Sequence, residues 1–260
     1  MSTDSPLLFT CADGIARLRF NRPAVLNAID VPTAQAFRAA CDSIAADASV
    51  RAVLLSGEGR AFVAGGDLAF MQAQPAAAVD GLIEPLHQGL LKLAAIDAPV
   101  VASVHGAAAG AGLSLMLAAD LVIAAEGTRF NLAYVNVGTS CDVGASWALP
   151  RVVGLRRAME IALLGDTLGA EQALQWGLVN RVVPAAELGE RTEALLQQLA
   201  RGPTKALGRL RRLMRQSLGT EFAPQLAAEA ESFAACAATA DFAEGVSAFL
   251  AKRPARFTGA

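Results

Sequence analysis

Residues 99–120, PVVASVHGAAAGAGLSLMLAAD, are the stretch of the chain that decides the fold. Residues 99–104 are a short apolar run rich in β-branched side chains, which is typical of a buried strand. From Gly110 onward, leucine and methionine recur at the density of a helix, so the periodicity changes at the glycines. The pattern predicts a strand, a tight turn and a helix.

The glycines of this turn allow one backbone to approach another closely, and the helix that follows begins with N–H groups that have no intrahelical partner. Such a turn can hold negative charge, although glycine and alanine also permit plain packing of a helix on a strand. The stretch is not a phosphate loop, because it lacks the Gly-Lys-Ser/Thr ending. It is not a dinucleotide fingerprint either, because Leu115 stands where the third glycine belongs.

A second turn of small residues precedes the first along the chain. Residues 51–56, RAVLLS, have the character of a buried strand, and residues 61–68, AFVAGGDL, follow a short glycine-containing turn. Gly65 and Gly66 can take positive φ and expose backbone amides. This turn is therefore a second candidate donor of backbone hydrogen bonds.

Length and composition favour a globular α/β protein with a substantial core, since 54% of the 260 residues are hydrophobic. A net charge of −2 gives no overall attraction to nucleic acid or to an anionic membrane. No apolar run is long enough to span a bilayer. The four widely spaced cysteines and the lack of a charged and then apolar leader predict a cytoplasmic location. Neither histidine belongs to a metal-binding motif, so we expect no metal site.

The rest of the chain predicts further elements in order. Residues 7–10 and 15–20 form a hairpin, and a helix capped by Thr33 runs to about residue 46. A long helical pattern over 75–96 carries His87 beside its apolar stripe. We expect a strand at 121–124, an irregular or short-strand segment at 129–137, a loop at 138–144, and helices at 145–149, 155–164 and 170–176.

Strand-turn-helix units recur to about residue 180, and from residue 185 the pattern is helical and rich in alanine. We therefore expect a core at 1–184 and a helical region at 185–260. Arg209, Arg211, Arg212 and Arg215 lie on one predicted helix and favour a solvated face, with a phosphorylated ligand or a neighbouring subunit as alternatives. Apolar residues continue almost to the end of the chain and indicate either oligomer contacts or docking on the core.

Four motifs in order resemble the crotonase, or enoyl-CoA hydratase/isomerase, superfamily, and together they cover nearly the whole chain. They are residues 21–29 (NRPAVLNAI), 59–68 (GRAFVAGGDL), 99–112 (PVVASVHGAAAGAG) and the region 124–151. The resemblance implies an α/β fold, a crotonase-like spiral of β-β-α units followed by a C-terminal helical oligomerisation region. It also implies a homotrimer or hexamer and an acyl-CoA thioester as substrate, with no cofactor beyond the coenzyme A that the substrate carries.

The resemblance also assigns residues by motif position. Two backbone N–H groups that bind the thioester oxygen fall on Gly66 and Ala111, one in each turn, and losing such a donor typically costs about 2.7–4 kcal/mol. Coenzyme A is expected along the first turn and its neighbours, and a weaker candidate for the nucleotide phosphates lies near the C-terminus. These residues are Val25, Ala64, Gly65, Asp67, Leu68 and, for the phosphates, Lys252.

The resemblance favours isomerase over hydratase chemistry. The two glutamates that hydratases use correspond here to Ser114 and Tyr134, and neither can act as a carboxylate base. Asp142 falls where the ring-epoxide and enoyl-CoA isomerases of phenylacetate degradation carry their catalytic aspartate. One carboxylate suffices for a 1,3-proton shift, and an apolar pocket raises its pKa. Taken without the resemblance, Asp142 is better explained as the cap of the helix that follows.

Two other hypotheses stay open. Asp142 and His87 also coincide with the nucleophile and the histidine base of 4-chlorobenzoyl-CoA dehalogenase, in which a carboxylate attacks an aromatic carbon. Tyr134 and Gly66 argue against this, because the dehalogenase carries bulkier aromatic residues at both places. Under the isomerase hypothesis too, Tyr134 is expected to line the acyl pocket, with donation of its hydroxyl to the substrate as the alternative. The third hypothesis is a protein that binds CoA esters without turnover, because the hydratase glutamates are missing.

Overall fold

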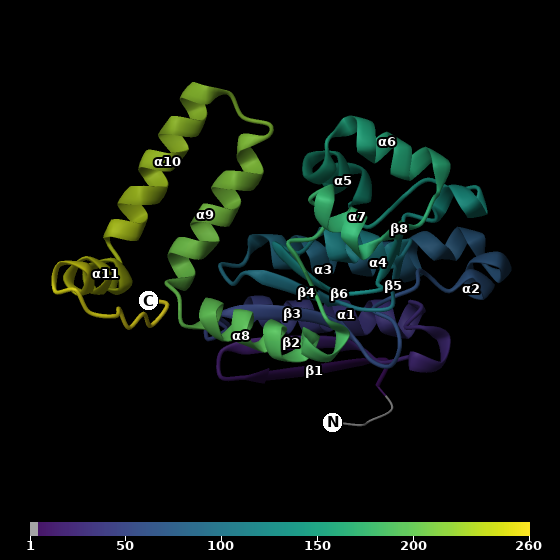
Figure 1. The fold of residues 1–260 in the computed structure, drawn as a ribbon, viewed down its shortest axis with the longest axis horizontal. Helices are drawn as coiled ribbons and strands as arrows, with labels where there is room; N and C mark the ends of the chain where they lie inside the picture. Colours follow the sequence, from purple (N-terminus) through teal and green to yellow (C-terminus); the bar gives the residue numbers. More distant parts are fainter. Residues whose placement is uncertain (1–4) are drawn as a thin grey trace.

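The computed structural model describes residues 5–260, which are built around a six-stranded sheet (Figure 1). The strand order is β1-β2-β3-β4-β6-β9, and every pairing is parallel except that of β1 with β2. The strands are β1 (Leu7–Ala12), β2 (Ile15–Phe20), β3 (Ala52–Gly57), β4 (Val100–Val104), β6 (Leu121–Ala125) and β9 (Arg181–Val183). The predicted hairpin and the three predicted parallel strands are thus confirmed, within a residue or two at their ends.

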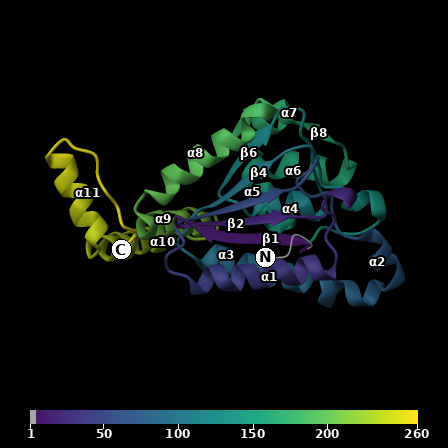
Figure 2. The ribbon, with the colours of Figure 1, turned by 90° about the horizontal axis from the view of Figure 1, so that it is seen from below.

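Helices cover both faces of this sheet (Figure 2). α1 (Val31–Ala46) and α3 (Glu84–Ala95) pack on one face and α8 (Leu188–Ala200) on the other. Successive strand residues alternate between the two faces, so Ala16 and Leu18 belong to one buried cluster while Ile15 belongs to the other. This arrangement buries both sides of the parallel strands.

A small second sheet holds the glycine-rich turn in place. It consists of β5 (Ala107–Ala109), β7 (Arg129–Asn131) and β8 (Leu168–Gly169), with β5 parallel to β7. Residues 107–109 were expected to be part of the turn, but they extend as a strand because β7 and residue 63 provide backbone partners. The helix that follows is α4 (Ala111–Leu117), as the change of period predicts.

Two predicted helices differ from the observed ones. α1 begins at Val31 and is capped by the Asp30 carboxylate, which accepts from the backbone N–H of Thr33, so Thr33 is not the cap. The long helix expected at 75–96 is divided into a 3-10 turn at Pro75–Ala77, a π-helical turn at Val79–Ile83 and α3. The core also contains α2 (Leu68–Ala73), α5 (Ala145–Val153), α6 (Leu155–Leu164) and α7 (Ala170–Gln175).

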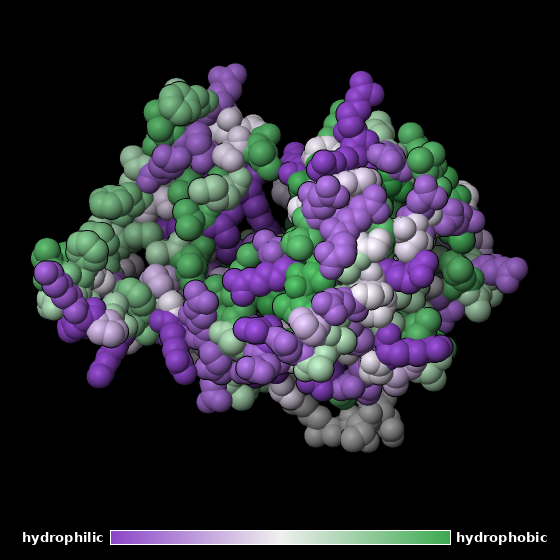
Figure 3. Space-filling view, in the orientation of Figure 1, coloured by the Kyte–Doolittle hydropathy of each residue, from purple (hydrophilic) through white to green (hydrophobic). Residues whose placement is uncertain are grey.

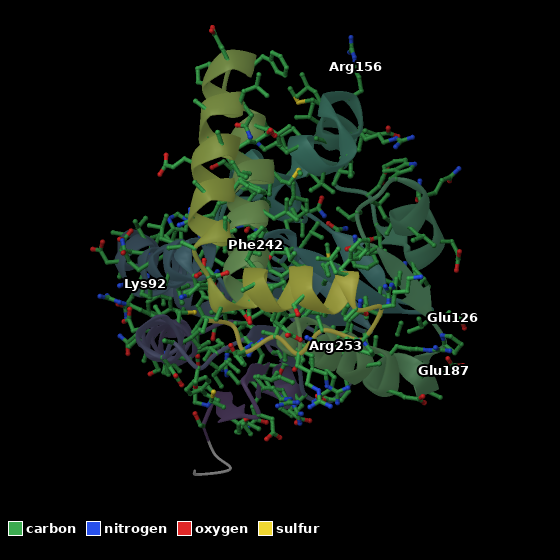
Figure 4. The ribbon with its side chains drawn as sticks, turned by 90° about the vertical axis from the view of Figure 1, so that its left-hand side faces the viewer. Lys92, Glu126, Arg156, Glu187, Phe242 and Arg253 are labelled. Atoms are coloured by element: carbon green, nitrogen blue, oxygen red, sulfur yellow. The ribbon has the colours of Figure 1, made fainter. Side chains whose placement is uncertain are left out.

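Three C-terminal helices form an arm that extends from one end of the core (Figures 1 and 2). They are α9 (Thr204–Ser217), α10 (Phe222–Ala237) and α11 (Ala240–Leu250). After α11 the chain runs back beside the helix, where Arg253 pairs with Glu244 at 2.7 Å (Figure 4). The division at residue 184 stays a prediction, but α8 packs its buried leucines on the sheet, so only α9–α11 extend beyond the core.

The arginines of α9 do not form the solvated face that the sequence favours. Arg211 and Arg215 both pair with Asp120, at 2.9 and 2.8 Å, and the Arg211 side chain is only 8% exposed. Arg212 pairs with Asp97 at 2.7 Å. The guanidinium of Arg211 also donates to carbonyl oxygens at the end of α3. These charges fasten the arm to the core, a role that needs long-range partners and therefore leaves no local pattern.

Among residues 5–260, no single helix has the length and apolar character needed to cross a membrane, and only α10 and α11 together, bent by 81°, reach that composition.

Candidate active site

The first turn, Ala64–Asp67, is held by backbone hydrogen bonds to the segment that follows β2. Ile29 N–H donates to Gly65 O at 2.9 Å, and Asp67 N–H donates to Ile29 O at 2.8 Å. Gly65 has φ +105°, a conformation that favours glycine. Within residues 5–260 the Gly66 N–H donates to no protein acceptor, so the first predicted donor is free for a ligand.

Asn27 supports the segment that leads into this turn, and it was not among the residues predicted for the site. Its side chain is 1% exposed, and its amide nitrogen lies within 3.0 Å of the carbonyl oxygens of Glu58, Ala61 and Phe62. Its place in the motif at residues 21–29 was the only signal available from the sequence. Asn27 therefore fixes the path of the chain into the first turn.

The second turn lies directly against the first. Val63 N–H donates to Ala107 O at 3.2 Å, and Ala109 N–H donates to Val63 O at 3.0 Å. A Cβ built on Gly110 would stand 3.5 Å from the Cα of Gly65, so the two glycine turns are in contact. The Ala111 N–H, at the start of α4, donates to no acceptor in the described part of the chain.

The packing explanation is correct for Gly106 and Gly112 but does not account for Gly110, and a Cβ on Gly106 would lie 1.9 Å from Arg60 O. A Cβ on Gly112 would lie 2.0 Å from Val63 O, so glycine is needed there for close packing. Gly110 has more room, but its φ of +50° and ψ of −122° are unusual for a residue with a side chain. That backbone conformation starts α4 at Ala111.

Asp142 is connected to the second turn by a chain of hydroxyl groups. The Tyr134 hydroxyl donates to Asp142 Oδ1, and Ser114 Oγ lies 3.0 Å from the same hydroxyl. Ser114 Oγ also donates to Gly110 O at 3.2 Å. Ser114 stands at the place of a hydratase glutamate, and its buried hydroxyl joins α4 to the loop that carries Asp142.

The environment favours a neutral tyrosine and a basic carboxylate. Burial raises the pKa of Asp142, and the hydrogen bond from Tyr134 limits that increase. Burial and the neighbouring Asp142 charge raise the pKa of Tyr134, so its hydroxyl remains a donor. Asp142 does not cap α5 through its side chain; the helix begins after Gly144 with no side-chain cap.

His87 reaches the same loop from α3. Its Nε2 accepts from the backbone N–H of Val143 at 3.1 Å. His87, Tyr134 and Asp142 therefore lie together, although they come from three separate segments of the chain. The loop 138–144 is the place where these segments meet.

The predicted coenzyme A residues divide into two groups. Val25 and Leu68 are exposed beside the first turn, with Ala64 and Gly65 between them in the chain. The Asp67 carboxylate accepts from Phe70 N–H at 3.1 Å and caps α2. Lys252 follows α11, and α11 lies at the opposite end of the molecule from α2 (Figures 1 and 2). Lys252 is therefore far from the first turn of its own chain.

The profile of the enoyl-CoA hydratase/isomerase family matches residues 10–260. The chain belongs to the enoyl-CoA hydratase/isomerase family. The crotonase resemblance and its fold are thereby confirmed, and the protein is an acyl-CoA enzyme.

Several members of the enoyl-CoA hydratase/isomerase family resemble the whole chain. A probable enoyl-CoA hydratase of Rhodobacter capsulatus is 39% identical over 251 residues, 96% of this chain and 97% of the relative. A 1,2-epoxyphenylacetyl-CoA isomerase of Escherichia coli is 38% identical and covers 95% of each chain. The crystal structure of a putative enoyl-CoA hydratase/isomerase of Mycobacterium abscessus has a TM-score of 0.93 at 34% identity, over 98% of this chain and 100% of that one. Hydratases and isomerases both occur among these relatives.

Proposed function

We propose that this family member moves a double bond in an acyl-CoA thioester by proton transfer. The thioester oxygen accepts from the N–H groups of Gly66 and Ala111. The Asp142 carboxylate removes a proton from the carbon chain, and the electron pair moves toward the oxygen to give a dienolate. Asp142 then returns the proton at the other end of the dienolate, so the base is regenerated.

The observation that carries this proposal is the connection of Asp142 through Tyr134 to Ser114. It brings one carboxylate with a raised pKa to the second turn, where the Ala111 N–H has no partner among residues 5–260. Hydration by two carboxylates finds no support here, since Ser114 and Tyr134 stand at the places where the resemblance expects glutamates. We expect Val25, Ala64, Gly65, Asp67 and Leu68 to accommodate the coenzyme A moiety, which belongs to the substrate.

Three thioesters distinguish the hypotheses. The purified protein is incubated with a 3-enoyl-CoA, a 2-enoyl-CoA and 4-chlorobenzoyl-CoA, and the products are separated by mass and retention. Migration of the double bond is the expected result. Addition of water to the 2-enoyl-CoA without migration would overturn the proposal, and binding of all three without turnover would support the third hypothesis.

The second candidate is an aryl-CoA dehalogenase or hydrolase. It is favoured by one observation, the hydrogen bond from Val143 N–H to His87, which brings His87 of α3 to the loop that carries Asp142. Chloride release from 4-chlorobenzoyl-CoA would establish it. In that reaction the carboxylate displaces chloride from the ring, and water then cleaves the ester.

Replacing Tyr134 with phenylalanine should shift the pH dependence of the isomerase. The variant loses the hydroxyl that donates to Asp142, and this bond lowers the pKa of the carboxylate. The pKa of Asp142 should therefore rise further, and the ionised base should appear only at higher pH. We expect the acidic limb of kcat/KM to move to higher pH, with activity approaching the wild-type value above it. A limb at its original pH would show that this bond does not tune Asp142.

We also propose that the arm joins copies of this chain into a homotrimer or hexamer. Large apolar side chains are exposed along α10 and α11, including Phe222, Phe233, Phe249 and Leu250. Figure 3 shows apolar surface over this arm. Burial of such surface favours association. Lys252 would then reach coenzyme A only from a second chain.

Light scattering after gel filtration measures the mass directly. We expect about three or six times the chain mass of 26.8 kDa. The double variant Phe249→Glu/Leu250→Glu should shift the mass toward a single chain, because it places charges in the apolar surface. A wild-type protein that elutes at the mass of one chain would contradict the proposal.

A further inference from the structure

Val143 is the residue of the active-site loop whose backbone most needs support. Its φ is +51°, its side chain is β-branched, and it is only 1% exposed. The left-handed conformation is unfavourable for a non-glycine residue, and especially for a β-branched one. Val143 directly follows Asp142, so its conformation helps to decide where the Asp142 side chain projects.

The bond between His87 and Val143 stabilises this conformation. Val143 N–H donates to Nε2 of His87 at 3.1 Å. His87 belongs to α3, which packs on the main sheet. A nitrogen that accepts a hydrogen bond carries no proton, so in this arrangement the imidazole proton is on Nδ1. A proton acceptor already engaged by Val143 is not free to take a proton from water.

We propose that His87 is a positioning residue for Asp142, acting through the backbone of Val143. The inference rests on the proposed isomerase function. Asp142 is then held from two sides, its carboxylate by Tyr134 and its backbone by the bond to His87. The role of base that the dehalogenase hypothesis gives to His87 would require the Val143 bond to break.

Two substitutions separate positioning from proton transfer. In His87→Gln the terminal amide lies about where Nε2 stands, so its oxygen can accept from Val143 but cannot take a proton. His87→Asn has the same chemistry on a side chain one methylene shorter, which ends near the place of Nδ1 and does not reach. Gln88→Ala, one position along α3, is the control, because the Gln88 amide bonds only to Glu84 of the same helix.

With the 3-enoyl-CoA substrate, we expect His87→Gln to keep kcat within about 3-fold and His87→Asn to lose about 10- to 100-fold, since misplacement of a reacting group by about 1 Å has effects of this size. KM should change little, because the thioester contacts come from other turns. Equal loss in both variants would assign His87 to proton transfer, and equal retention would leave it without a role. Either result overturns the inference.

Hydrogen exchange tests the same bond without the reaction. The amide of Val143, followed in the peptide that spans residues 138–144, should exchange slowly in the wild type and in His87→Gln. It should exchange faster in His87→Asn at an unchanged melting temperature. Equal exchange in all three proteins would overturn the inference. If the wild type shows no isomerase activity but the exchange pattern is as expected, the proposed function fails while the His87 bond stands.

Discussion

Asp142→Asn is expected to lower kcat for double-bond migration by about 10²- to 10⁴-fold, the usual contribution of a positioned acid or base. Asparagine keeps the size of the side chain and offers an oxygen to the Tyr134 hydroxyl, so the loop should retain its structure. What is lost is the ability to take up a proton. KM and the melting temperature should change little, because in the proposed mechanism backbone groups of other residues hold the thioester.

The comparison requires a matched change elsewhere. Asp13→Asn makes the same substitution in the exposed turn between β1 and β2, where φ is +54° and asparagine is well tolerated. It should leave kcat unchanged. Exchange of substrate carbon-bound protons in deuterated water gives a second readout, and it should stop with the isomerase activity. Full activity of Asp142→Asn would remove the base from the proposed mechanism.

Ala111→Pro should remove one donor of the proposed oxyanion hole and leave the rest of the turn in place. Proline has no N–H group, and it fits the first position of a helix, which is where Ala111 stands in α4. No hydrogen bond within residues 5–260 is lost, because the Ala111 N–H donates to none. The expected decrease in kcat is about 10²- to 10³-fold, since that is the size of a single oxyanion donor.

Ala111→Gly is the matched control, because it keeps the N–H group and shortens the side chain. Its kcat should stay within a few-fold of the wild-type value, and circular dichroism should show that both variants retain α4. A normal kcat for Ala111→Pro would mean that the thioester oxygen does not bind at this turn. Equal losses in the proline and glycine variants would instead indicate a requirement for the alanine side chain.

Local pattern was sufficient for much of the fold. Apolar runs and their change of period placed β3, β4, β6 and α4, because strand and helix impose different spacings on buried side chains. The turn at Gly65 and the turn at Gly110 were also visible, since positive φ selects glycine. The short strand β5 was not predicted, because its extended backbone depends on hydrogen bonds to β7 and to residue 63.

The candidate site was predicted less completely. The resemblance supplied Gly66, Ala111 and Asp142, while the residues alone favoured Asp142 as a helix cap over a base. Neither route predicted the hydroxyl chain from Asp142 to Ser114, the bond from Val143 to His87, or the support that Asn27 gives the first turn. Each of these contacts joins separate segments of the chain, and the spacing of residues within one segment does not predict its contacts with another.

By itself, the sequence therefore determined the order of strands and helices, the two glycine turns and the family. The tertiary structure alone decided that the two turns touch, that Asp142 meets the second of them through Tyr134, and that Arg211 fastens the arm to Asp120. The reason is physical. Spacing and φ are imposed on a segment by its own backbone, whereas hydrogen bonds and ion pairs between distant segments exist only after the sheets bring those segments together.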